Sequence, residues 1–339
     1  MSNDLFFSII IINYNGHEFI ENCLRSVLSS SYANFEVIVF DNASADDSLK
    51  IVSQYFNNCQ NLKIIKSKTN LGFARANNEA AKLAKGSILV FLNVDTKVDK
   101  DWLFYIFEAI ETDQLIGAGQ CKLKNYYNPE IIDSAGHYID KFGLVHVLGD
   151  SEIDIGQFDK NKCIFAATGA AFVCKKSVFE KVNGFDNDFF MFFEETDLCW
   201  RIWLAGYKII FIPQAVVYHA RGGIRKACKK DKIAFDFNYF FIRNRISSLI
   251  KNYGLKNLFF FLPMNILISL IWIAPMVLIR FDFKSAKSII HGVAWNLLNF
   301  KKNLKKRMIV QKQRKVTDKY LFDNDLIKNF SIASLLQKI

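Results

Sequence analysis

Four short apolar runs in the N-terminal third constrain the fold more than any other feature of this sequence. They cover residues 6–12, 35–40, 62–65 and 89–92, and each is followed by a segment in which apolar residues recur at helical spacing. A regular alternation of strand and helix favours an α/β fold with a doubly wound, Rossmann-like, mostly parallel sheet and helices on both faces.

Polar, turn-forming residues follow each predicted strand. In a parallel sheet such groups share one edge, which is where open α/β sheets bind ligands. One such residue alone is as well explained by a turn, but four sets together predict a ligand site. The sets are Asn13 with Asn15, Asp41 with Asn42, Asn70 with Gly72, and Asn93 with Asp95.

Composition excludes several other classes of protein. A chain of 339 residues with 51% hydrophobic residues fills a sizeable core, which argues against disorder. Seven cysteines with no Cys-x-x-Cys pair indicate reduced, packed thiols rather than a disulfide framework or a zinc site. We identify no secretory signal at the N-terminus, so we expect a cytoplasmic location.

The motifs at the strand ends resemble those of family 2 glycosyltransferases, which are inverting enzymes with the GT-A fold. In the nucleotide-sugar-binding half the matching stretches are IIINYNG (10–16), VFDNAS (39–44), NLGF (70–73) and FLNVD (91–95). Residues 169–172, 184–186, 193–201 and 205–207 look like the acceptor half. The resemblance is closest to rhamnosyltransferase-like members. It implies a catalytic domain over residues 1–223, divided into halves at 1–98 and 99–223.

The resemblance also implies a set of donor-binding residues. Asp41 stands where the family has a carboxylate that accepts a hydrogen bond from the imide nitrogen of the base, which favours UDP or dTDP. Asn77 stands where many relatives have arginine, so the guanidinium contact usual in the family is missing here or is made by Arg75. Arg221 and the following glycines are expected to meet phosphate, a flexible surface loop being the alternative. The remaining candidates are Asn13, Asn15, Asn42, Asn70, Gly72 and Asn93.

A divalent metal site is expected at the end of the fourth strand. The family usually has Asp-x-Asp there, whereas this chain has Asn93-Val94-Asp95, so Asp95 is the main anionic ligand. His219 matches the family's histidine that helps to ligate the metal or diphosphate, although a lone histidine is more often a packed residue. Mg²⁺ or Mn²⁺ prefers oxygen ligands, and we expect a loose site completed by the donor's phosphates.

The candidate catalytic residues are Glu194, Glu195 and Asp197. The first two occupy the family's Glu-Asp pair, which places Glu195 in the role of the base. Adjacent carboxylates are usually only a solvated helix start. Here they follow an aromatic run, residues 189–193, which would exclude water and raise the pKa of a carboxyl group. Asp197 is expected to orient the loop or to bind the acceptor.

The region 224–315 is basic and apolar. Residues 220–315 hold 21 Lys and Arg against three Asp, a net charge of +18, which leaves −7 of the total +11 for the rest. Residues 257–279 are long enough to span a bilayer, but their prolines and the basic flanks favour an interfacial or re-entrant helical pair with residues 288–300. A helical cap buried on the catalytic domain or in a homodimer is the alternative. Residues 316–339 form a tail of unassigned role.

The resulting hypothesis is a metal-dependent inverting glycosyltransferase. It would move a sugar, with rhamnose as one candidate, from a UDP- or dTDP-sugar to a saccharide hydroxyl. Attachment at the inner face of the cell membrane suggests a lipid-linked acceptor and cell-envelope polysaccharide synthesis. The alternatives are a nucleotidyltransferase and a non-catalytic membrane-associated binder of sugar nucleotides or nucleic acid; nucleic acid is the less favoured partner.

Overall fold

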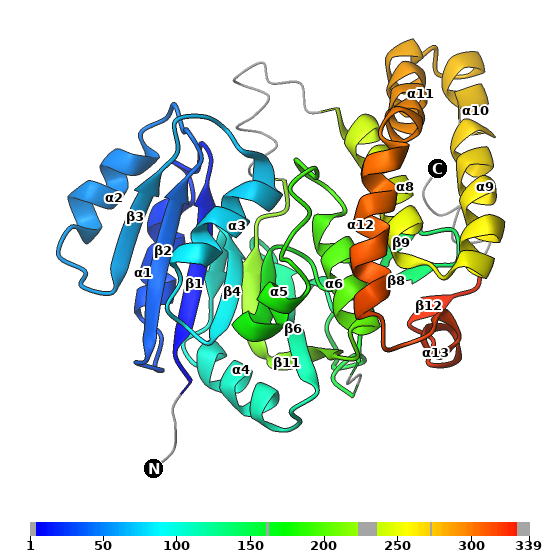
Figure 1. The fold of residues 1–339 in the computed structure, drawn as a ribbon. Helices are drawn as coiled ribbons and strands as arrows, with labels where there is room; N and C mark the ends of the chain where they lie inside the picture. The colour runs from blue at the N-terminus through cyan, green and yellow to red at the C-terminus, as the bar shows by residue number, and fades with distance from the viewer. Residues whose placement is uncertain (1–4, 161–162, 223–235, 272, 331–339) are drawn as a thin grey trace.

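A mixed nine-stranded sheet organises the N-terminal two thirds of the chain (Figure 1). The computed structural model describes residues 5–160, 163–222, 236–271 and 273–330. The strands run in the order β3-β2-β1-β4-β10-β6-β11-β5, with β7 paired to β6. They are β1 (Phe7–Asn13), β2 (Phe35–Asp41), β3 (Leu62–Lys66), β4 (Ile88–Asn93), β5 (Thr96–Val98), β6 (Ile116–Asn125), β7 (Ile132–Ser134), β10 (Ala171–Lys175) and β11 (Lys208–His219).

The first four strands confirm the predicted parallel arrangement. β1 pairs in parallel with β2 and β4, and β2 pairs in parallel with β3. The sheet departs from this pattern at β10, which runs antiparallel between β4 and β6. The predicted α/β class is therefore correct, but only the first four strands are uniformly parallel. Over the described sheet four strand pairs are parallel and four are antiparallel, because β5 and β7 also pair antiparallel, with β11 and β6.

Helices cover both faces of the sheet, because alternate residues of a buried strand point to opposite sides. Ile9 and Ile11 of β1 pack into one core, whereas Ile10 packs into the other. Helices α1 (Ile20–Leu28), α2 (Ser48–Phe56) and α4 (Trp102–Glu111) contribute to the first core. Helices α3 (Gly72–Leu83), α5 (Lys176–Lys181) and α6 (Glu194–Leu204) contribute to the second.

A helical region stands beside the sheet (Figure 1). It comprises α8 (Phe237–Asn252), α9 (Leu255–Ile271), α10 (Ile273–Leu278), α11 (Phe283–Leu298) and α12 (Phe300–Gln313). Helices α9 and α10 lead away from the catalytic domain, and α11 and α12 return. Leu249 and Tyr253 are fully buried in the same core as Trp200 of α6. The helical region therefore shares a core with the predicted catalytic domain.

The described part of the tail is also joined to that domain. After α13 (Asp318–Asp323), strand β12 (Ile327–Lys328) pairs in parallel with β8 (His137–Asp140), which pairs with β9 (Val145–Val147). This small second sheet connects residues 316–330 to the acceptor half. Residues 224–235 and 331–339, which the sequence places in the helical region and the tail, lie outside the described residues.

Candidate active site

The ends of β1 and β4 meet at the predicted ligand edge. Ile12 is paired with Asn93, and Gly16 of the turn after β1 lies against Val94. A Cβ atom at Gly16 would come within 2.4 Å of Asn13 Oδ1 and 2.9 Å of Val94. Only glycine therefore allows the turn after β1 to lie this close to the Asn93-Val94-Asp95 segment.

The side chain of Asn13 links the ends of β1 and β2. Its Nδ2 atom donates hydrogen bonds to Asp41 Oδ1 at 2.9 Å, Ser44 Oγ at 3.0 Å and Ser48 Oγ at 2.8 Å. Asn13 and Asp41 are both buried, and Asn13 Oδ1 has no hydrogen-bond partner among the described residues. On the same turn, Asn15 Oδ1 accepts a hydrogen bond from the amide of Ala45 at 2.8 Å.

The end of β3 is held to the end of β2 in the same way. Asn42 Nδ2 donates to Asn70 Oδ1 at 3.0 Å, and the amide of Gly72 donates to the same oxygen at 2.9 Å. Gly72 has a φ of +74°, and a Cβ atom there would lie 2.3 Å from the carbonyl oxygen of Phe190. Asn77 is different, because its buried amide donates to Phe73 O inside α3 at 3.0 Å. The structure therefore brings the strand-end residues together and leaves Asn77 in the helix.

His219 faces Asp95 at the same edge, because β11 pairs with β5 and sets His219 opposite Thr96. The distance from His219 Nε2 to Asp95 Oδ1 is 3.5 Å, and that buried oxygen accepts no hydrogen bond from the described residues. The other ring nitrogen, Nδ1, lies 2.8 Å from Asp133 Oδ2. A histidine held by a carboxylate at one nitrogen presents the other in a fixed direction, as metal-binding histidines do.

These residues fit a divalent cation. Two ligand atoms at about 2.1 Å from a common ion lie at most about 4.2 Å apart, which accommodates the Asp95–His219 distance. Burial lowers the pKa of His219, but Asp133 and Asp95 more than compensate and raise it to about 9. A cation between Asp95 and His219 would displace that proton. The described residues contain no cluster of three His, Cys, Asp or Glu side chains suited to a metal, so other ligands would have to complete the shell.

Asp133 is a site residue that our sequence reasoning missed. It accepts a hydrogen bond from His219 and pairs with Arg221, whose Nε lies 2.6 Å from Asp133 Oδ1. Arg221 Nη1 also contacts Asp150 Oδ1 at 2.6 Å. The guanidinium group of Arg221 thus holds Asp133, the hydrogen-bond partner of His219, in place. A signal was present, since Asp133 lies in the turn-rich sequence Asp-Ser-Ala-Gly after two isoleucines, but nothing in the sequence places it beside His219.

Glu194 and Glu195 begin helix α6. Burial raises the pKa of both carboxyl groups, and for Glu194 the neighbouring Glu195 raises it further, well above its usual range. Glu194 is buried and Glu195 is half-buried, and within the part of the chain that the structure describes the Oε2 atom of each has no hydrogen-bond partner. A raised pKa makes a carboxylate a stronger proton acceptor than an ordinary glutamate.

The segment Gly169-Ala170 connects this glutamate pair to the end of β4. The amide of Gly169 donates to Glu195 Oε1 at 3.3 Å, and the carbonyl of Ala170 accepts from the amide of Asn93 at 3.1 Å. Glu195 and the Asn93-Val94-Asp95 turn are therefore both hydrogen-bonded to one dipeptide. A proton acceptor, a carboxylate–histidine pair and a polar strand edge thus adjoin one another.

Comparison with known proteins identifies this arrangement. The model of the family described as "Glycosyl transferase family 2" matches residues 8–182, which is more than half of the chain. The chain belongs to glycosyl transferase family 2. A second family model, "N-terminal domain of galactosyltransferase", matches residues 155–221 of this family 2 glycosyltransferase. Membership decides for a transferase and against the two alternatives considered from the sequence.

Relatives of this family 2 glycosyltransferase support the same classification. It is 27% identical over 215 residues to the poly-beta-1,6-N-acetyl-D-glucosamine synthase of Staphylococcus epidermidis, covering 62% of this chain and 49% of that protein. The chain thus spans about half the length of this curated relative. Among solved structures, GalNAc-T7 with UDP, GalNAc and Mn²⁺ has a TM-score of 0.61 at 18% identity, over 77% of this chain and 50% of that one.

A second solved structure covers more of the chain. The mannosyltransferase of Pyrobaculum calidifontis in complex with GDP-Man and Mn²⁺ has a TM-score of 0.53 at 16% identity, over 92% of this chain and 86% of that one. At these identities the likeness establishes the fold alone. The GT-A fold expected from the sequence is therefore confirmed.

Asp197 of the family 2 glycosyltransferase lies away from the glutamate carboxylates. Its fully buried carboxylate accepts hydrogen bonds from Arg201 Nε at 2.9 Å and Ser248 Oγ at 2.8 Å, and it lies 3.0 Å from Lys251 Nζ. Burial opposes ionisation, but Lys251 and Arg201 hold the pKa of Asp197 below its usual range. These contacts make Asp197 a residue that joins α6 to α8, and they leave it no exposed oxygen for an acceptor.

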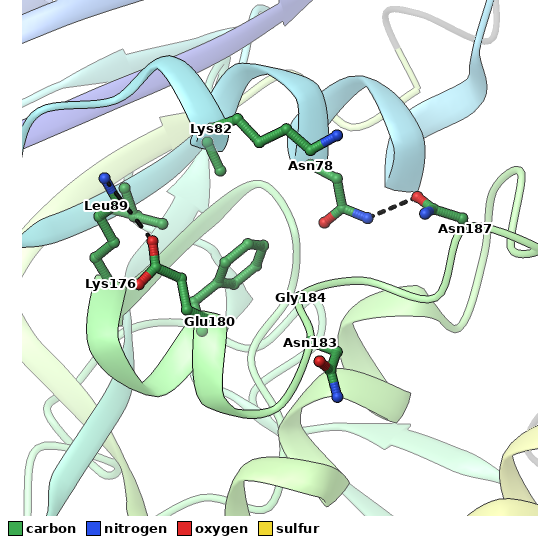
Figure 2. A pocket seen from close by; sticks show the side chains of 10 residues that line it. Asn78, Lys82, Leu89, Lys176, Glu180, Asn183, Gly184 and Asn187 are labelled. Atoms are coloured by element: carbon green, nitrogen blue, oxygen red, sulfur yellow. Dashed lines mark hydrogen bonds and ion pairs between the residues drawn. The ribbon is translucent and has the colours of Figure 1, made fainter. Parts of the chain in front are cut away.

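Two cavities lie near helix α3. The smaller, about 210 Å³, is drawn in Figure 2, where Asn78 and Asn187 point toward each other across its rim. None of the predicted site residues lines it, so it is not the candidate active site. The larger, about 470 Å³, lies between residues 69–71, loop 187–190 and the helical region, and Asn70 and Trp295 both line it.

Proposed function

We propose that this protein is a metal-dependent inverting glycosyltransferase that moves a sugar from a UDP- or dTDP-sugar to a saccharide hydroxyl. The observation that carries this proposal is the Gly169-Ala170 bridge, which ties the base candidate Glu195 to the turn that holds Asp95. Inversion requires the base and the departing diphosphate to lie on opposite sides of the reacting carbon. The bridge holds the base candidate and the turn with Asp95 next to each other, which leaves room for a reacting sugar between them only if they do not contact directly; no hydrogen bond between Glu195 and Asp95 is found among the described residues.

Each part of the site has a role in this reaction. Glu195 removes the proton from the acceptor hydroxyl as the oxygen attacks the sugar's anomeric carbon, and the bond from that carbon to the nucleoside diphosphate breaks. A divalent cation, Mg²⁺ or Mn²⁺, held by Asp95 and His219 supplies Lewis-acid neutralisation of the leaving diphosphate when bound. Asp133 keeps His219 directed at that position, and Arg221 holds Asp133 in place.

The nucleotide is proposed to lie along the strand-end edge. Asn13, Asp41, Asn42 and Asn70 form the polar surface there, and Asp41 is the proposed partner of the imide of uracil or thymine. Residues Asn15, Gly72 and Asn93 complete the set, from which we omit Asn77 because its amide is used inside α3. The Mn²⁺ and UDP in the GalNAc-T7 structure support this choice of donor and cofactor class.

We propose that the helical region attaches the enzyme to a membrane surface. Helix α9 buries its polar side and exposes its apolar side, the reverse of a soluble helix. Asn265 donates to Phe142 O, and Ser269 accepts from Arg245 Nη2 at 2.8 Å, whereas Phe259 is 77% exposed. Other large apolar side chains exposed in α9, α10, α11 and their connections are Leu255, Phe260, Met264, Leu267, Leu270, Ile271, Leu278, Ile279, Phe281, Phe283, Ile290, Leu297 and Leu298.

Interfacial attachment is favoured over spanning. Residues Leu255–Pro275 are long and apolar enough to cross a bilayer by length and composition, with a mean hydropathy of 2.0. If α9 spanned the bilayer, however, Asn265 and the part of the catalytic domain to which it is hydrogen-bonded would also have to lie inside the bilayer. Exposed Lys256, Arg280 and Lys284 would meet anionic headgroups instead.

A membrane-bound enzyme of this class implies a lipid-linked saccharide acceptor at the inner face of the cell membrane, in cell-envelope polysaccharide synthesis. The synthase of Staphylococcus epidermidis makes a polysaccharide by its printed name, which supports this setting. Rhamnose remains one candidate sugar, on the strength of the rhamnosyltransferase-like motifs.

Hydrolysis of the donor tests the activity without knowledge of the acceptor. The full chain is incubated with UDP- and dTDP-sugars, with Mn²⁺, Mg²⁺ or EDTA, and the released nucleotide is measured. The proposal is supported if nucleotide is released from either the UDP-sugars or the dTDP-sugars and if EDTA abolishes that release. Release of inorganic pyrophosphate, or metal-independent release, would contradict it.

Vesicle flotation tests the membrane surface separately. We expect the protein to float with phosphatidylglycerol vesicles and much less with phosphatidylcholine vesicles. Phe259→Ser with Phe260→Ser should weaken flotation, whereas a change of an exposed aromatic residue outside the helical region, Tyr127→Ser, should not. Flotation unaffected by the double substitution would contradict this placement of the surface.

A further inference from the structure

We propose that Asn244 of α8 is a positioning residue for the glutamate pair, acting through the loop that precedes α6 (residues 186–193, here loop 186–193). This inference rests on the proposed role of Glu195 as the base. It assigns part of the active-site geometry to the helical region, which contributes none of the candidate catalytic residues.

The backbone just before the glutamates has an unfavourable conformation. Phe192 and Phe193 have φ values of 66° and 72°, in the left-handed region that residues with a Cβ atom seldom adopt. Phe193 is also the residue from which α6 starts, so its conformation sets the direction in which Glu194 and Glu195 project. Two adjacent phenylalanines keep this conformation only if surrounding contacts hold them.

Asn244 supplies those contacts. Its side chain is fully buried, and Nδ2 donates to the carbonyl oxygens of Met191 at 3.0 Å and Phe192 at 2.7 Å. Its Oδ1 accepts a hydrogen bond from Arg243 Nε at 2.9 Å. Both amide hydrogens and the amide oxygen of Asn244 therefore form hydrogen bonds. If the amide were flipped, Oδ1 would face two carbonyl oxygens, and these two hydrogen bonds would be lost. One side chain thus fixes two successive peptide groups.

Packing around Asn244 holds the same loop. Phenylalanine rings of the loop contact rings of α8 in pairs, Phe190 with Phe240 at 5.5 Å and Phe193 with Phe241 at 5.7 Å between centroids. Arg243 donates to the carbonyl of Asp188 and lies 4.9 Å from the ring centroid of Trp295. The loop is therefore built against α8 along its length.

The glutamate side chains have little else to position them. From the described residues the Glu195 carboxylate receives one hydrogen bond, from Gly169, and neither Oε2 atom of the pair has a partner. The location of the proton acceptor is thus set by the start of α6 rather than by a web of side chains. Asn244 controls that start.

Asn296 of α11 provides a matched control. It is a buried asparagine whose Nδ2 also donates to two carbonyls, those of Arg243 at 2.9 Å and Gly292 at 3.0 Å, and whose Oδ1 also accepts a hydrogen bond. It has no hydrogen bond to loop 186–193. Asn244→Ala and Asn296→Ala therefore remove the same interactions, and only the first removes them from the loop.

The test compares these variants in the full chain. The readouts are kcat and KM for nucleotide release from UDP-N-acetylglucosamine, or from the sugar nucleotide most active in the donor panel, together with UDP–Mn²⁺ affinity by calorimetry. Hydrogen–deuterium exchange of the peptide covering residues 189–197 adds a readout that does not depend on activity. Melting temperatures report stability.

We expect Asn244→Ala to lower kcat about 100-fold, since a shift of about 1 Å in a reacting group has that effect, with KM and UDP affinity within about twofold. Exchange in residues 189–197 should accelerate. Asn296→Ala should lower the melting temperature comparably but leave kcat within about twofold. Equal effects of the two variants on kcat, or unchanged exchange in Asn244→Ala, would overturn the proposal.

A second substitution tests the backbone conformation itself. Asparagine tolerates the left-handed region better than phenylalanine, so adding Phe192→Asn to Asn244→Ala should restore part of kcat. It should do so even though it removes the contact between the Phe192 and Phe237 rings, whose centroids lie 4.8 Å apart. A further loss would show that packing, and not the backbone conformation, is what matters, and would overturn the proposal. If Glu195→Gln itself left kcat unchanged, the role of the base would fail, while the exchange result would still report on the loop.

Discussion

The amide of Gly169 donates a hydrogen bond to Glu195 Oε1 at 3.3 Å, and Gly169 stands one residue from the carbonyl that binds the end of β4. The antiparallel strand β10 begins at the next residue, Ala171. The placement of β10, antiparallel between β4 and β6, therefore brings the acceptor half of the chain to the sheet edge where the donor is proposed to bind.

The two glutamates should respond differently to substitution. Glu195→Gln removes the proposed base and should lower kcat by about 10²- to 10⁴-fold with donor affinity unchanged. Glu194→Gln should have a much smaller effect, because burial and its neighbour already hold Glu194 toward the protonated form, which glutamine resembles. Steady-state nucleotide release and UDP calorimetry measure both. A larger loss for Glu194→Gln than for Glu195→Gln would reverse the assignment.

The activity should fall on acidification at a higher pH than an ordinary glutamate would give. Burial raises the pKa of Glu195 above 4.5, and only the deprotonated carboxylate accepts a proton, so the activity is present above the raised pKa and is lost as the pH falls through it. The pH profile of kcat/KM for donor hydrolysis reports this limb for the free enzyme. A limb at or below pH 4.5 would contradict the buried environment.

Metal affinity should depend on a residue that would not contact the metal. Asp133→Asn removes the charge behind His219 and should weaken Mn²⁺ binding by about 10- to 100-fold. Asp150→Asn is the control, because Asp150 contacts Arg221 and not His219. Calorimetric titration of Mn²⁺ in the presence of UDP measures both variants. Equal affinities in the two would exclude Asp133 from the metal site.

Lys251 should be far more important for stability than its exposed counterpart Lys302. Lys251 Nζ lies between Asp186 and Asp197 with side chains that are at most 6% exposed, and its loss leaves buried carboxylates without their main cation. We expect Lys251→Met to lower the free energy of unfolding by about 3–5 kcal/mol. Lys302→Met, whose lysine side chain is 51% exposed, should cost less than about 1 kcal/mol.

The same ion pairs fix the sign of a pH effect. Lys251 lowers the pKa of both Asp186 and Asp197 against the effect of burial, so their contribution is present above the unfolded pKa of about 4 and is lost as the pH falls. Urea unfolding at pH 6 and pH 3 should show a smaller loss of stability in Lys251→Met than in the wild type. An identical dependence would argue against the ion pairs.

The parallel half of the fold was predictable because its signals are local. Each strand is a continuous apolar run, and each strand end carries its own polar residues, so Asn13, Asp41, Asn70 and Asp95 could be placed at one edge from spacing alone. Within this half the structure differs mainly for Asn77, whose amide bonds to the carbonyl four residues earlier. A helix periodicity alone does not show which face an asparagine occupies.

The second half could not be read in this way, because its arrangement depends on contacts between distant segments. Asp133 meets His219 across 86 residues, and Asn244 meets Phe192 across 52. The basic region shows the same difficulty. Its charge suggested a surface for anionic partners, yet Lys251, Lys302 and Lys306 are used in ion pairs with loop 186–193 and α6. Net charge in a sequence does not distinguish internal pairs from an exposed patch.

The buried lysine on α8 also bears on where the catalytic unit ends. The family match ends at residue 182, yet Asp186 and Asp197 obtain their counter-charge from Lys251. A chain cut before α8 would keep the donor edge and the Arg201–Asp197 pair, but it would lose Lys251 and uncover the aromatic loop that packs on α8. Exchanging the helical region between relatives would therefore require exchanging residues 186–201 with it.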